Sequence, residues 1–372
     1  MAKLRVLVKS PLAGTFALSL LLLVAVGGWL LKDPNTTRSE ALKTGGLAGG
    51  AIVALYALWL NDRRRRVEER RQEIERQRHD LEMRRTEQDR ERISDERFAK
   101  SVELLGNDAD QVRVGAMHAL AGVARSRPEY TQTVLDVLCS YLRRPYTHAC
   151  YEQSGPATDP HDRDGVTGTP EQELELQVRL TAQRLIVDLL PEADDAKAPG
   201  YDLDLTGAAV EYLDLSGRKI GKILLRYAGL HSSTNLSGCR ILGPAYFTAA
   251  GSTRGRLIGS FRCRDTTFQQ RAWFSGTIFG AKADFRGATF AGETNFKYAV
   301  FAGDADLKDV TFTNGLSLHQ TRFGGHVDLT FKQAPKSLEL YNTMVDPDQE
   351  IALPPEWKLE PLRDGKARIV VA

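Results

Sequence analysis

The chain has few cysteines and no recognisable catalytic motif. Its 372 residues include four cysteines, none in a CxxC pair, so a disulfide framework is excluded. This usage fits a reducing compartment or simply buried thiols. There is no Walker motif and no HExxH motif, and no His, Cys or Ser has an identifiable catalytic partner. The sequence therefore predicts a protein that is not an enzyme, with no catalytic residue, no cofactor and no metal ion.

A strong excess of one charge is also missing from the chain as a whole. The 50 Lys and Arg residues nearly balance the 48 Asp and Glu residues, and the net charge is +2. Between Tyr201 and Pro335, however, 16 basic residues outnumber 11 acidic ones. That part of the chain therefore carries a net positive charge, which disfavours functions that need an acidic surface.

Two stretches near the N-terminus lack charged residues altogether. They are Pro11–Leu31 and Thr44–Leu60. As helices that rise about 1.5 Å per residue, they would measure roughly 31 and 25 Å, enough to cross the core of a bilayer. Residues 1–60 are therefore predicted to form a transmembrane hairpin. The alternatives are a cleaved signal peptide for the first stretch and a buried soluble helix for the second.

The flanking charges and the glycines refine this prediction. Lys3, Arg5 and Lys9 precede the first span and Arg63–Arg66 follow the second, which predicts a multi-pass cell-membrane protein with both termini cytoplasmic and the 32–43 loop outside. The second span also carries two overlapping GxxxG pairs, Gly45 with Gly49 and Gly46 with Gly50. Such pairs allow close helix packing, either inside the hairpin or between protomers of a homo-oligomer.

Residues 61–98 form a charged stretch without Gly or Pro. It contains 13 Arg and 12 Asp or Glu, with opposite charges three and four residues apart, which predicts a helical stalk of about 55–60 Å. Val67, Ile74 and Leu81 are spaced by seven, but the other core positions of a coiled coil are mostly Arg. We therefore favour a self-supporting helix and leave a dimeric coiled coil as the alternative. Because the acidic residues nearly match the arginines in number, this stretch is poorly suited to binding nucleic acid.

Residues 99–200 show helical periodicity. Apolar faces recur at Phe98–Leu105, Val112–Val123, Val134–Leu142 and Glu171–Leu190. The stretch RFAKSVELLGNDADQVRVGAMHALAGVARSRPEYTQTVLDVLCSYLR resembles the HEAT-type helical module that lies beside pentapeptide repeats in actinobacterial proteins.

The loop at residues 145–170 interrupts these helices, and two possible metal-ligand patterns include residues of this loop. Asp162, Asp164, Gly165 and Glu171 have EF-hand spacing, but Pro160 occupies the first ligand position, so a solvated acidic loop is the better interpretation. Four residues could also supply zinc ligands, although their spacing matches no standard zinc finger. They are Cys139, His148, Cys150 and His161.

Large apolar residues recur at alternating steps of six and five in the second half of the chain. Small or β-branched residues stand two positions before nearly all of them, for example Ala272 before Phe274. A helix has a period of 3.6 and a strand a period of 2, so the pattern predicts a chain that turns a corner every few residues. The large residues are Phe268, Phe274, Phe279, Phe285, Phe290, Phe296, Phe301, Leu307, Phe312, Leu318, Phe323 and Leu329.

The segments LDLTGAAV, EYLDLSG, TNLSGCRI, KADFRGATF and GDADLKDVTF resemble pentapeptide-repeat proteins, and the likeness covers roughly 201–331. The resemblance implies a right-handed quadrilateral β-helix at residues 201–335 and a C-terminal cap at residues 336–372. One coil should take roughly 20 residues early and roughly 22 residues later. The resemblance stacks Phe274 on Phe296 and Leu318. It also makes Cys239 and Cys263 structural thiols, in a small and a large inward position.

These features favour a membrane-anchored interaction protein over two other classes. Some pentapeptide-repeat proteins mimic DNA and regulate nucleic-acid enzymes such as gyrase, but the basic repeat region disfavours that alternative. An unrecognised enzyme is the other, yet His231, His319 and His326 fit surface or corner positions. We expect a non-enzymatic scaffold that presents the β-helix to the cytoplasm. Its protein partner cannot be identified from the sequence, and the residues between the large anchors are where to look for binding.

Overall fold

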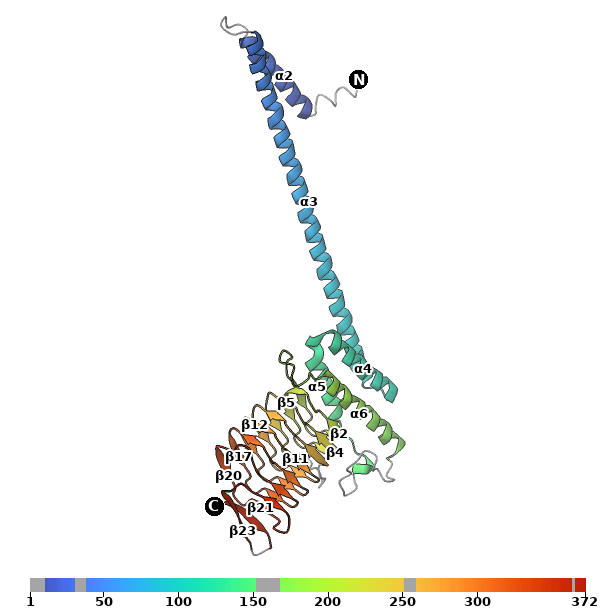
Figure 1. Ribbon diagram of the computed structural model, residues 1–372. Coiled ribbons are helices and arrows are strands. Elements are labelled where there is room, and N and C mark those ends of the chain that lie inside the picture. The colour runs from blue at the N-terminus through green and yellow to red at the C-terminus, as the bar shows by residue number, and fades with distance from the viewer. Residues whose placement is uncertain (1–10, 31–37, 152–167, 251–258, 363–364) are drawn as a thin grey trace. The chain divides into compact units, whose positions relative to one another are not determined.

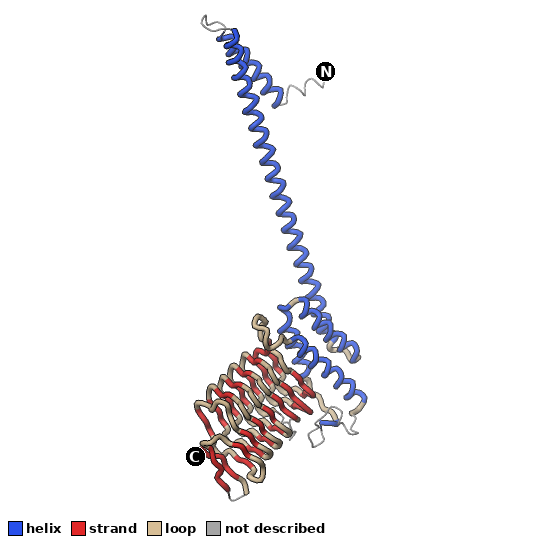
Figure 2. The backbone as a smooth tube through the Cα atoms, viewed as in Figure 1, coloured by secondary structure: helices blue, strands red, loops and turns tan. Residues whose placement is uncertain are grey.

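The computed structural model describes residues 11–30, 38–151, 168–250, 259–362 and 365–372 (Figure 1). It contains two compact units, Met1–Arg92 and Ile93–Ala372, which we describe separately. Helices make up the first unit, and the second combines helices with short parallel strands (Figure 2).

Two helices pack against each other in the first unit. They are α2 (Pro11–Leu30) and α3 (Arg38–Leu104), whose last turns belong to the second unit. The Oγ of Ser19 donates a hydrogen bond to the carbonyl oxygen of Gly49 at 2.7 Å. A Cβ on Gly49 would lie 3.2 Å from the carbonyl oxygen of Ser19, and one on Gly45 would lie 3.0 Å from that of Leu23. The Gly45–Gly49 pair therefore allows the close approach within the hairpin.

Among the described residues, one helix is long and apolar enough to cross a membrane. It lies within Leu42–Leu104, and only 11% of its most apolar window is buried, unlike the core helix of a soluble domain. The apolar part of α2, Gly14–Trp29, is shorter than a candidate span. The basic residues before α2 lie outside the described residues.

The predicted charged helix is continuous with the apolar one. Residues 61–98 all belong to α3, where ion pairs join Arg65 to Glu69 at 2.9 Å and Asp62 to Arg66 at 2.6 Å. The heptad-spaced Val67, Ile74 and Leu81 are exposed. The alternative, a dimeric coiled coil between two copies of this helix, therefore stays a prediction.

Three further helices stand near the predicted positions in the second unit. They are α4 (Asp110–Ser126), α5 (Thr131–Leu142) and α6 (Pro170–Leu189), with short 3₁₀ turns at Pro128–Tyr130 and Ala149–Tyr151. Thr169 and Gln172 form a capping box that starts α6, with Pro170 in its first turn. The buried residues of α4, α5 and α6 join the core of the strands that follow, so these helices cover the first coil rather than standing beside it.

The strands wind into a four-sided solenoid (Figure 1). We name its faces A to D in chain order. Face A holds β5 (Arg240–Ile241), β8 (Thr267–Phe268), β12 (Thr289–Phe290) and β16 (Thr311–Phe312). Face B holds β6 (Ala245–Tyr246), β9 (Ala272–Trp273), β13 (Thr294–Asn295), β17 (Gly315–Ser317) and β20 (Ser337–Glu339). Face C holds β10 (Ile278–Phe279), β14 (Val300–Phe301), β18 (Arg322–Phe323) and β21 (Met344–Val345). Face D holds β7 (Ser260–Arg262), β11 (Ala283–Asp284), β15 (Ala305–Asp306), β19 (Val327–Asp328) and β22 (Ile351–Ala352).

Four longer strands bend around corners in the first coils. β1 (Tyr201–Asp204) and β3 (Lys219–Leu224) run from face A to face B, and β2 (Ala209–Asp214) and β4 (Gly229–Asn235) run from face C to face D. All pairs between neighbouring coils are parallel, as in β10 with β14. The strands of faces A to D therefore satisfy their backbone groups through the coil above or below them.

Two kinds of corner alternate, and they explain the steps of five and six. After faces B and D the chain makes a tight turn whose third residue has φ between +52° and +69°. In the Phe-rich coils these corners take five residues, as from Phe274 to Phe279, and the wider corners after faces A and C take six. A φ above zero at this position favours Gly, Asn or Asp. The residues there are Gly207, Gly217, Tyr227, Gly238, Ala249, Asp265, Gly276, Gly287, Tyr298, Asp309, Gln320 and Asn342.

The inward phenylalanines stack as the repeat predicts. Thr294 pairs with Ala272 in one neighbouring coil and with Leu316 in the other, which places Phe296 between Phe274 and Leu318. The rings of Phe274 and Phe296 lie 4.7 Å apart at an interplanar angle of 9°. Each of these buried rings contributes roughly 2–3 kcal/mol through apolar burial.

One coil departs from this register. Thr234 pairs with Phe261 across a coil that is longer than its neighbours, and residues 251–258, including the predicted anchor Leu257, lie outside the described part of the chain. Phe247, rather than Tyr246, is the fully buried anchor. Phe261 fills a small inward position and Cys263 the large one after it, so the two sizes are exchanged.

The solenoid continues past residue 335. β20, β21 and β22 pair in parallel with the preceding coil, so that Ala352 lies opposite Asp328. The chain then reverses: β23 (Trp357–Pro361) and β24 (Ala367–Val371) form an antiparallel pair, and β24 also pairs with β21. This hairpin covers part of the last exposed strand edge, the position at which another chain could add.

Candidate partner-binding surface

The sequence predicts no metal ion, although two metal-ligand patterns occur in or near the 145–170 loop. The described residues contain no group of three or more His, Cys, Asp and Glu side chains that could hold a metal ion. Cys139 lies in the core, and the Nε2 of His148 is 3.1 Å from a carboxylate oxygen of Glu173. The Cys150 side chain, His161 and the EF-hand-like residues 160–165 lie outside the described part of the structure.

The described cysteines have the environment of structural thiols. Cys139, Cys239 and Cys263 are free and buried. Burial raises the pKa of Cys139 and of Cys239 to about 12 and that of Cys263 well above its ordinary value. The protonated thiol therefore dominates at neutral pH, and these cysteines are poor nucleophiles.

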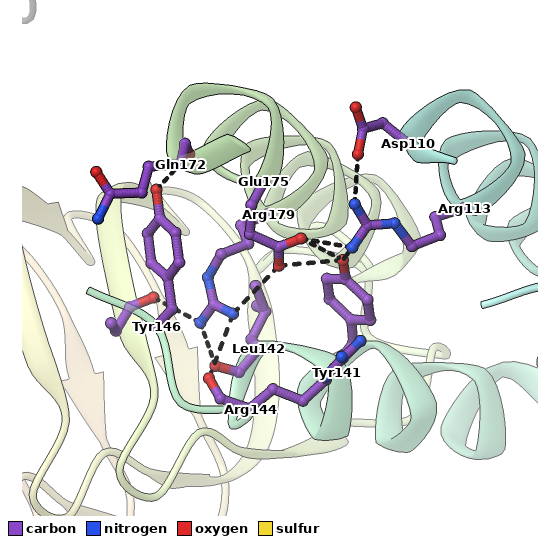
Figure 3. Close-up of polar contacts among 10 residues, drawn as sticks. Asp110, Arg113, Tyr141, Leu142, Arg144, Tyr146, Gln172, Glu175 and Arg179 are labelled. Carbon is purple, nitrogen blue, oxygen red and sulfur yellow. Dashed lines mark hydrogen bonds and ion pairs between the residues drawn. The ribbon is translucent and has the colours of Figure 1, made fainter. Parts of the chain in front are cut away.

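The most concentrated polar cluster joins the helices to the first coils (Figure 3). Glu175 lies between Arg113 and Arg179, with oxygens 2.5 Å from Arg113 Nη1 and 3.8 Å from Arg179 Nη1. The Tyr141 hydroxyl donates to the same carboxylate at 3.1 Å, and burial, followed by the Glu175 charge, raises the pKa of Tyr141 to about 12. Arg179 also donates to the carbonyl oxygen of Ala209 at 3.1 Å.

This cluster is a structural junction. Glu175 pairs with both cations, and Arg113 is also paired with Asp110. Arg179 is itself buried among backbone carbonyls and under the ring of Tyr146, whose centroid lies 4.8 Å from the guanidinium carbon. Such buried, paired charges hold α4, α5 and α6 in register with the first coils, although the Nε atoms of Arg113 and Arg179 make no hydrogen bond.

A second contact closes the same junction. The rings of Tyr151 and His231 stack with centroids 3.6 Å apart and planes 4° apart, and Tyr151 donates to the buried Glu211 at 3.3 Å. The other two histidines of the repeat region lie near acidic side chains. His319 Nδ1 is 2.7 Å from a carboxylate oxygen of Glu339, and His326 Nδ1 is 3.5 Å from one of Glu350.

On face D, Arg264 and Arg286 are paired with carboxylates. Asp284 is only 2% exposed, and its oxygens lie 2.5 Å from Arg264 and 2.8 Å from Arg286. Burial raises the pKa of this carboxyl, but hydrogen bonds from Arg286 and Arg264 outweigh it, so the pKa is lowered. Arg286 also contacts Asp306 at 3.1 Å. These charges satisfy one another.

The outward side chains of face B are different. The register places Leu224, Tyr246 and Trp273 in one column, because β3 pairs with β6 and β6 with β9. Arg226 follows Leu224 by two positions and Arg271 precedes Trp273 by two. We call Arg226, Tyr246, Trp273 and Arg271 the ladder.

Cation–π and aromatic contacts connect the ladder from end to end. The Arg226 guanidinium carbon lies 4.2 Å from the Tyr246 ring centroid. Tyr246 meets Trp273 edge to face at 5.3 Å and 87°, and the Arg271 guanidinium carbon lies 5.6 Å from the Trp273 ring. The rings are half-buried and Arg271 is exposed. Trp, Tyr and Arg are the residues most enriched in the energetic centres of protein interfaces.

A second aromatic group lies further along the same face. Tyr298 and Tyr341 are 53% and 67% exposed and flank His319, with ring centroids 5.7 and 5.0 Å away. Lys297 Nζ lies 5.6 Å from the Tyr298 ring. The Ser317 hydroxyl, and then His319, lower the pKa of Glu339 by hydrogen bonding to its carboxylate. Face B thus carries aromatic side chains over much of its length.

The sequence pointed to the outward positions but not to these residues. Inward residues repeat at fixed steps, whereas Tyr246 and Trp273 occupy positions at which no repeat is expected. The longer coil also separates them by an irregular interval. Only the register shows that they share a column.

Comparison with known proteins identifies the Phe-rich coils. Residues 274–322 match the family model described as Pentapeptide repeats (9 copies). This match confirms the predicted resemblance for these residues, and the solenoid extends in both directions beyond the matched pentapeptide repeats. No curated protein and no solved structure matches the chain.

Proposed function

We propose that the protein is a membrane-anchored, non-enzymatic scaffold that binds a protein partner on face B of its solenoid. The observation that carries the proposal is the ladder, an aromatic and cationic strip on an otherwise repetitive fold. Solenoids commonly use one extended face for binding because neighbouring repeats present it as a rigid surface. The candidate membrane helix within Leu42–Leu104 supports the anchoring.

In this proposal α2 is the second membrane span. It is apolar throughout, and Ser19 and Leu23 pack closely against the glycines of α3. Both termini then face the cytoplasm, in keeping with the arginines that follow Leu60. A reporter active only in the cytoplasm, fused after Arg66, should be active. Activity of a reporter that works only outside the cytoplasm would contradict this topology.

Self-association through α3 is a second element of the proposal. A Cβ on Gly46 or Gly50 would meet no atom within 4 Å, unlike one on Gly45 or Gly49. Gly46 and Gly50 lie in a shallow groove lined also by Lys43, Leu47, Ala51 and Ala54. A second copy of the chain can use this pair in the way that α2 uses the other. The two readings of the overlapping GxxxG pairs then apply to different sides of one helix.

Crosslinking followed by isolation of the tagged chain from native membranes tests the scaffold. We expect a defined protein partner whose recovery falls when Tyr246 and Trp273 are both replaced by Ala. The matched control is replacement of the exposed Arg240 and Arg322, which lie on faces A and C. Equal recovery with both pairs of variants, or no partner and no self-association, would contradict the proposal.

A further inference from the structure

The two arginines of the ladder are held by aromatic rings rather than by acids. Among the described residues, neither Arg226 nor Arg271 forms an ion pair, and each guanidinium instead lies near an aromatic ring. The Arg226 Nε is buried and has no hydrogen-bond partner. That Nε is covered by the protein, so the terminal nitrogens of the Arg226 guanidinium are the donors that a ligand oxygen would meet.

Other basic residues near the start of face B already have carboxylate partners. Lys222 lies 3.3 Å from Asp202, and Arg143 lies 2.8 Å from Asp204. Asp204, the carboxylate closest in register to Arg226, therefore already has a cationic partner. Glu293 is one coil from Arg271 in the adjacent position, yet it forms no ion pair with it in the described structure. Among the described residues, Arg226, Arg271 and Lys297 are thus cations of face B that form no ion pair, and only Arg226 and Arg271 belong to the ladder.

The register gives the spacing between these cations. Leu224 pairs with Tyr246 and Tyr246 with Trp273, so Arg226 and Arg271 lie two coils apart. Two steps of about 4.8 Å place them roughly 10 Å apart along the solenoid axis, with the Tyr246 and Trp273 rings between. Arg226 and Arg271 also lie on opposite edges of face B, and the chain of ring contacts at 4.2, 5.3 and 5.6 Å keeps their guanidinium carbons within about 15 Å of each other. Three or four residues of an extended peptide span roughly 10–13 Å, which falls within that limit.

We propose that the ladder binds an acidic, extended segment of a partner protein, with two carboxylates three or four residues apart and an apolar side chain between them. The carboxylates accept hydrogen bonds from the Arg226 and Arg271 guanidinium groups, whose planar donors match carboxylate geometry. The apolar side chain packs on the half-exposed Tyr246 and Trp273 rings. This inference rests on the proposed function and adds the chemistry of the partner.

A peptide fits face B better than a nucleic acid does. A phosphate backbone gains its affinity from many basic contacts along a groove. Here two available arginines stand on a face that also carries the acidic Asp202, Glu293 and Glu339. Those carboxylates would repel a long polyanion more strongly than a segment that carries only two carboxylates.

The test uses the purified full chain in nanodiscs and a display library of random ten-residue peptides. We expect selected peptides to be enriched in acidic pairs three or four residues apart. The leading peptide should bind about tenfold more weakly when either glutamate is changed to glutamine. The double variant R226Q/R271Q should lose that discrimination, while R240Q/R322Q, which removes the same charge from faces A and C, should keep it.

Several results would overturn the inference. They are an absence of enriched peptides, selection of neutral or basic peptides, or acidic peptides that bind R226Q/R271Q as tightly as the wild type. A single-stranded oligonucleotide that competes for the ladder more strongly than the peptide would do the same. Hydrogen exchange of the β6 and β9 amides in R226Q/R271Q must match the wild type, which separates lost binding from misfolding.

The outcome can be separated from that of the proposed function. If membrane crosslinking captures a partner through Tyr246 and Trp273 but the crosslinked segment is not acidic, the scaffold stands and the acidic-segment inference fails. If nothing is captured through face B, both fail.

Discussion

Inward columns of the solenoid repeat one kind of residue, whereas the outward column of face B changes at every coil. Phe268, Phe290 and Phe312 stack in parallel rings 4.8 and 5.3 Å apart. The outward column instead reads Leu224, Tyr246, Trp273, Asn295, Ser317 and Glu339. Packing between identical coils selects similar inward residues. Outward residues are free of that requirement, so the repeat does not dictate them, and the register alone shows which of them share a surface.

The sharpest test of this contrast replaces one inward ring. Phe285→Ala should lower the free energy of unfolding of the solenoid by about 3–5 kcal/mol, because the buried ring is replaced by a cavity. Hydrogen exchange of the β11 and β12 amides measures the loss. A cost below about 1 kcal/mol would contradict the assignment of these rings to the core. The Phe285 ring packs against Phe261, Phe274, Phe279, Phe290 and Phe296.

An outward residue with a structural role qualifies the contrast. Asp284→Asn on face D should cost about 1.5–3 kcal/mol at neutral pH, since it weakens charge-assisted hydrogen bonds from Arg264 and Arg286. The folded pKa of Asp284 is lowered, so its contribution is complete above the ordinary value of 3.8 and is lost as pH falls through the folded value.

Urea unfolding of the wild type and D284N at several pH values checks this. The two stabilities should converge below about pH 4. A difference that stays constant down to acid pH would show that Asp284 does not act through its charge.

The glycines of α3 offer a similar contrast on a helix. Gly49→Ile should open the α2–α3 hairpin at a cost of about 1–3 kcal/mol, because a side chain there meets the Ser19 backbone. Gly46→Ile should leave the hairpin intact and reduce co-isolation of two differently tagged copies. Distances between spin labels at Ala17 and Val53, in a chain with its native cysteines replaced, report on the hairpin. Identical effects of the two substitutions would contradict the assignment of Gly49 to hairpin packing and of Gly46 to self-association.

The smallest stability effect is expected on the ladder. Trp273→Ala should change the free energy of unfolding by less than about 1 kcal/mol, because the side chain is only half-buried on an outward face. Partner recovery from membranes should nevertheless fall. A loss of stability comparable with that of Phe285→Ala would place Trp273 in the fold and remove the argument for binding.

Much of the solenoid could be predicted from the sequence because its core obeys a local rule. Phe274 and Phe296 could be stacked from spacing alone, since identical coils return to the same column. Phe261 could not, because a large residue stands where the rule expects a small one, next to a coil of irregular length. The β23–β24 hairpin follows no repeat, and its pairing with β21 is a tertiary contact that spacing does not encode.

The junction and the ladder were beyond sequence reasoning for a related reason. Arg179 and Glu175 look like ordinary charges on an amphipathic helix, and only packing against the first coils buries Arg179. Tyr246 and Trp273 are well separated in the sequence and become neighbours through the register of the longer coil. The sequence directs attention to the outward positions, but which of them share a face depends on the structure.

Photocrosslinking in intact membranes tests most directly whether face B is the working surface. A photoreactive amino acid would be placed in turn at the outward positions Asn295 and Ser317 on face B, which flank the ladder without belonging to it, and at Val300 and Arg322 on face C. We expect one discrete protein adduct from the face B positions, none from face C, and loss of the adduct in R226Q/R271Q. Equal labelling from both faces, or an adduct from face C alone, would contradict the account.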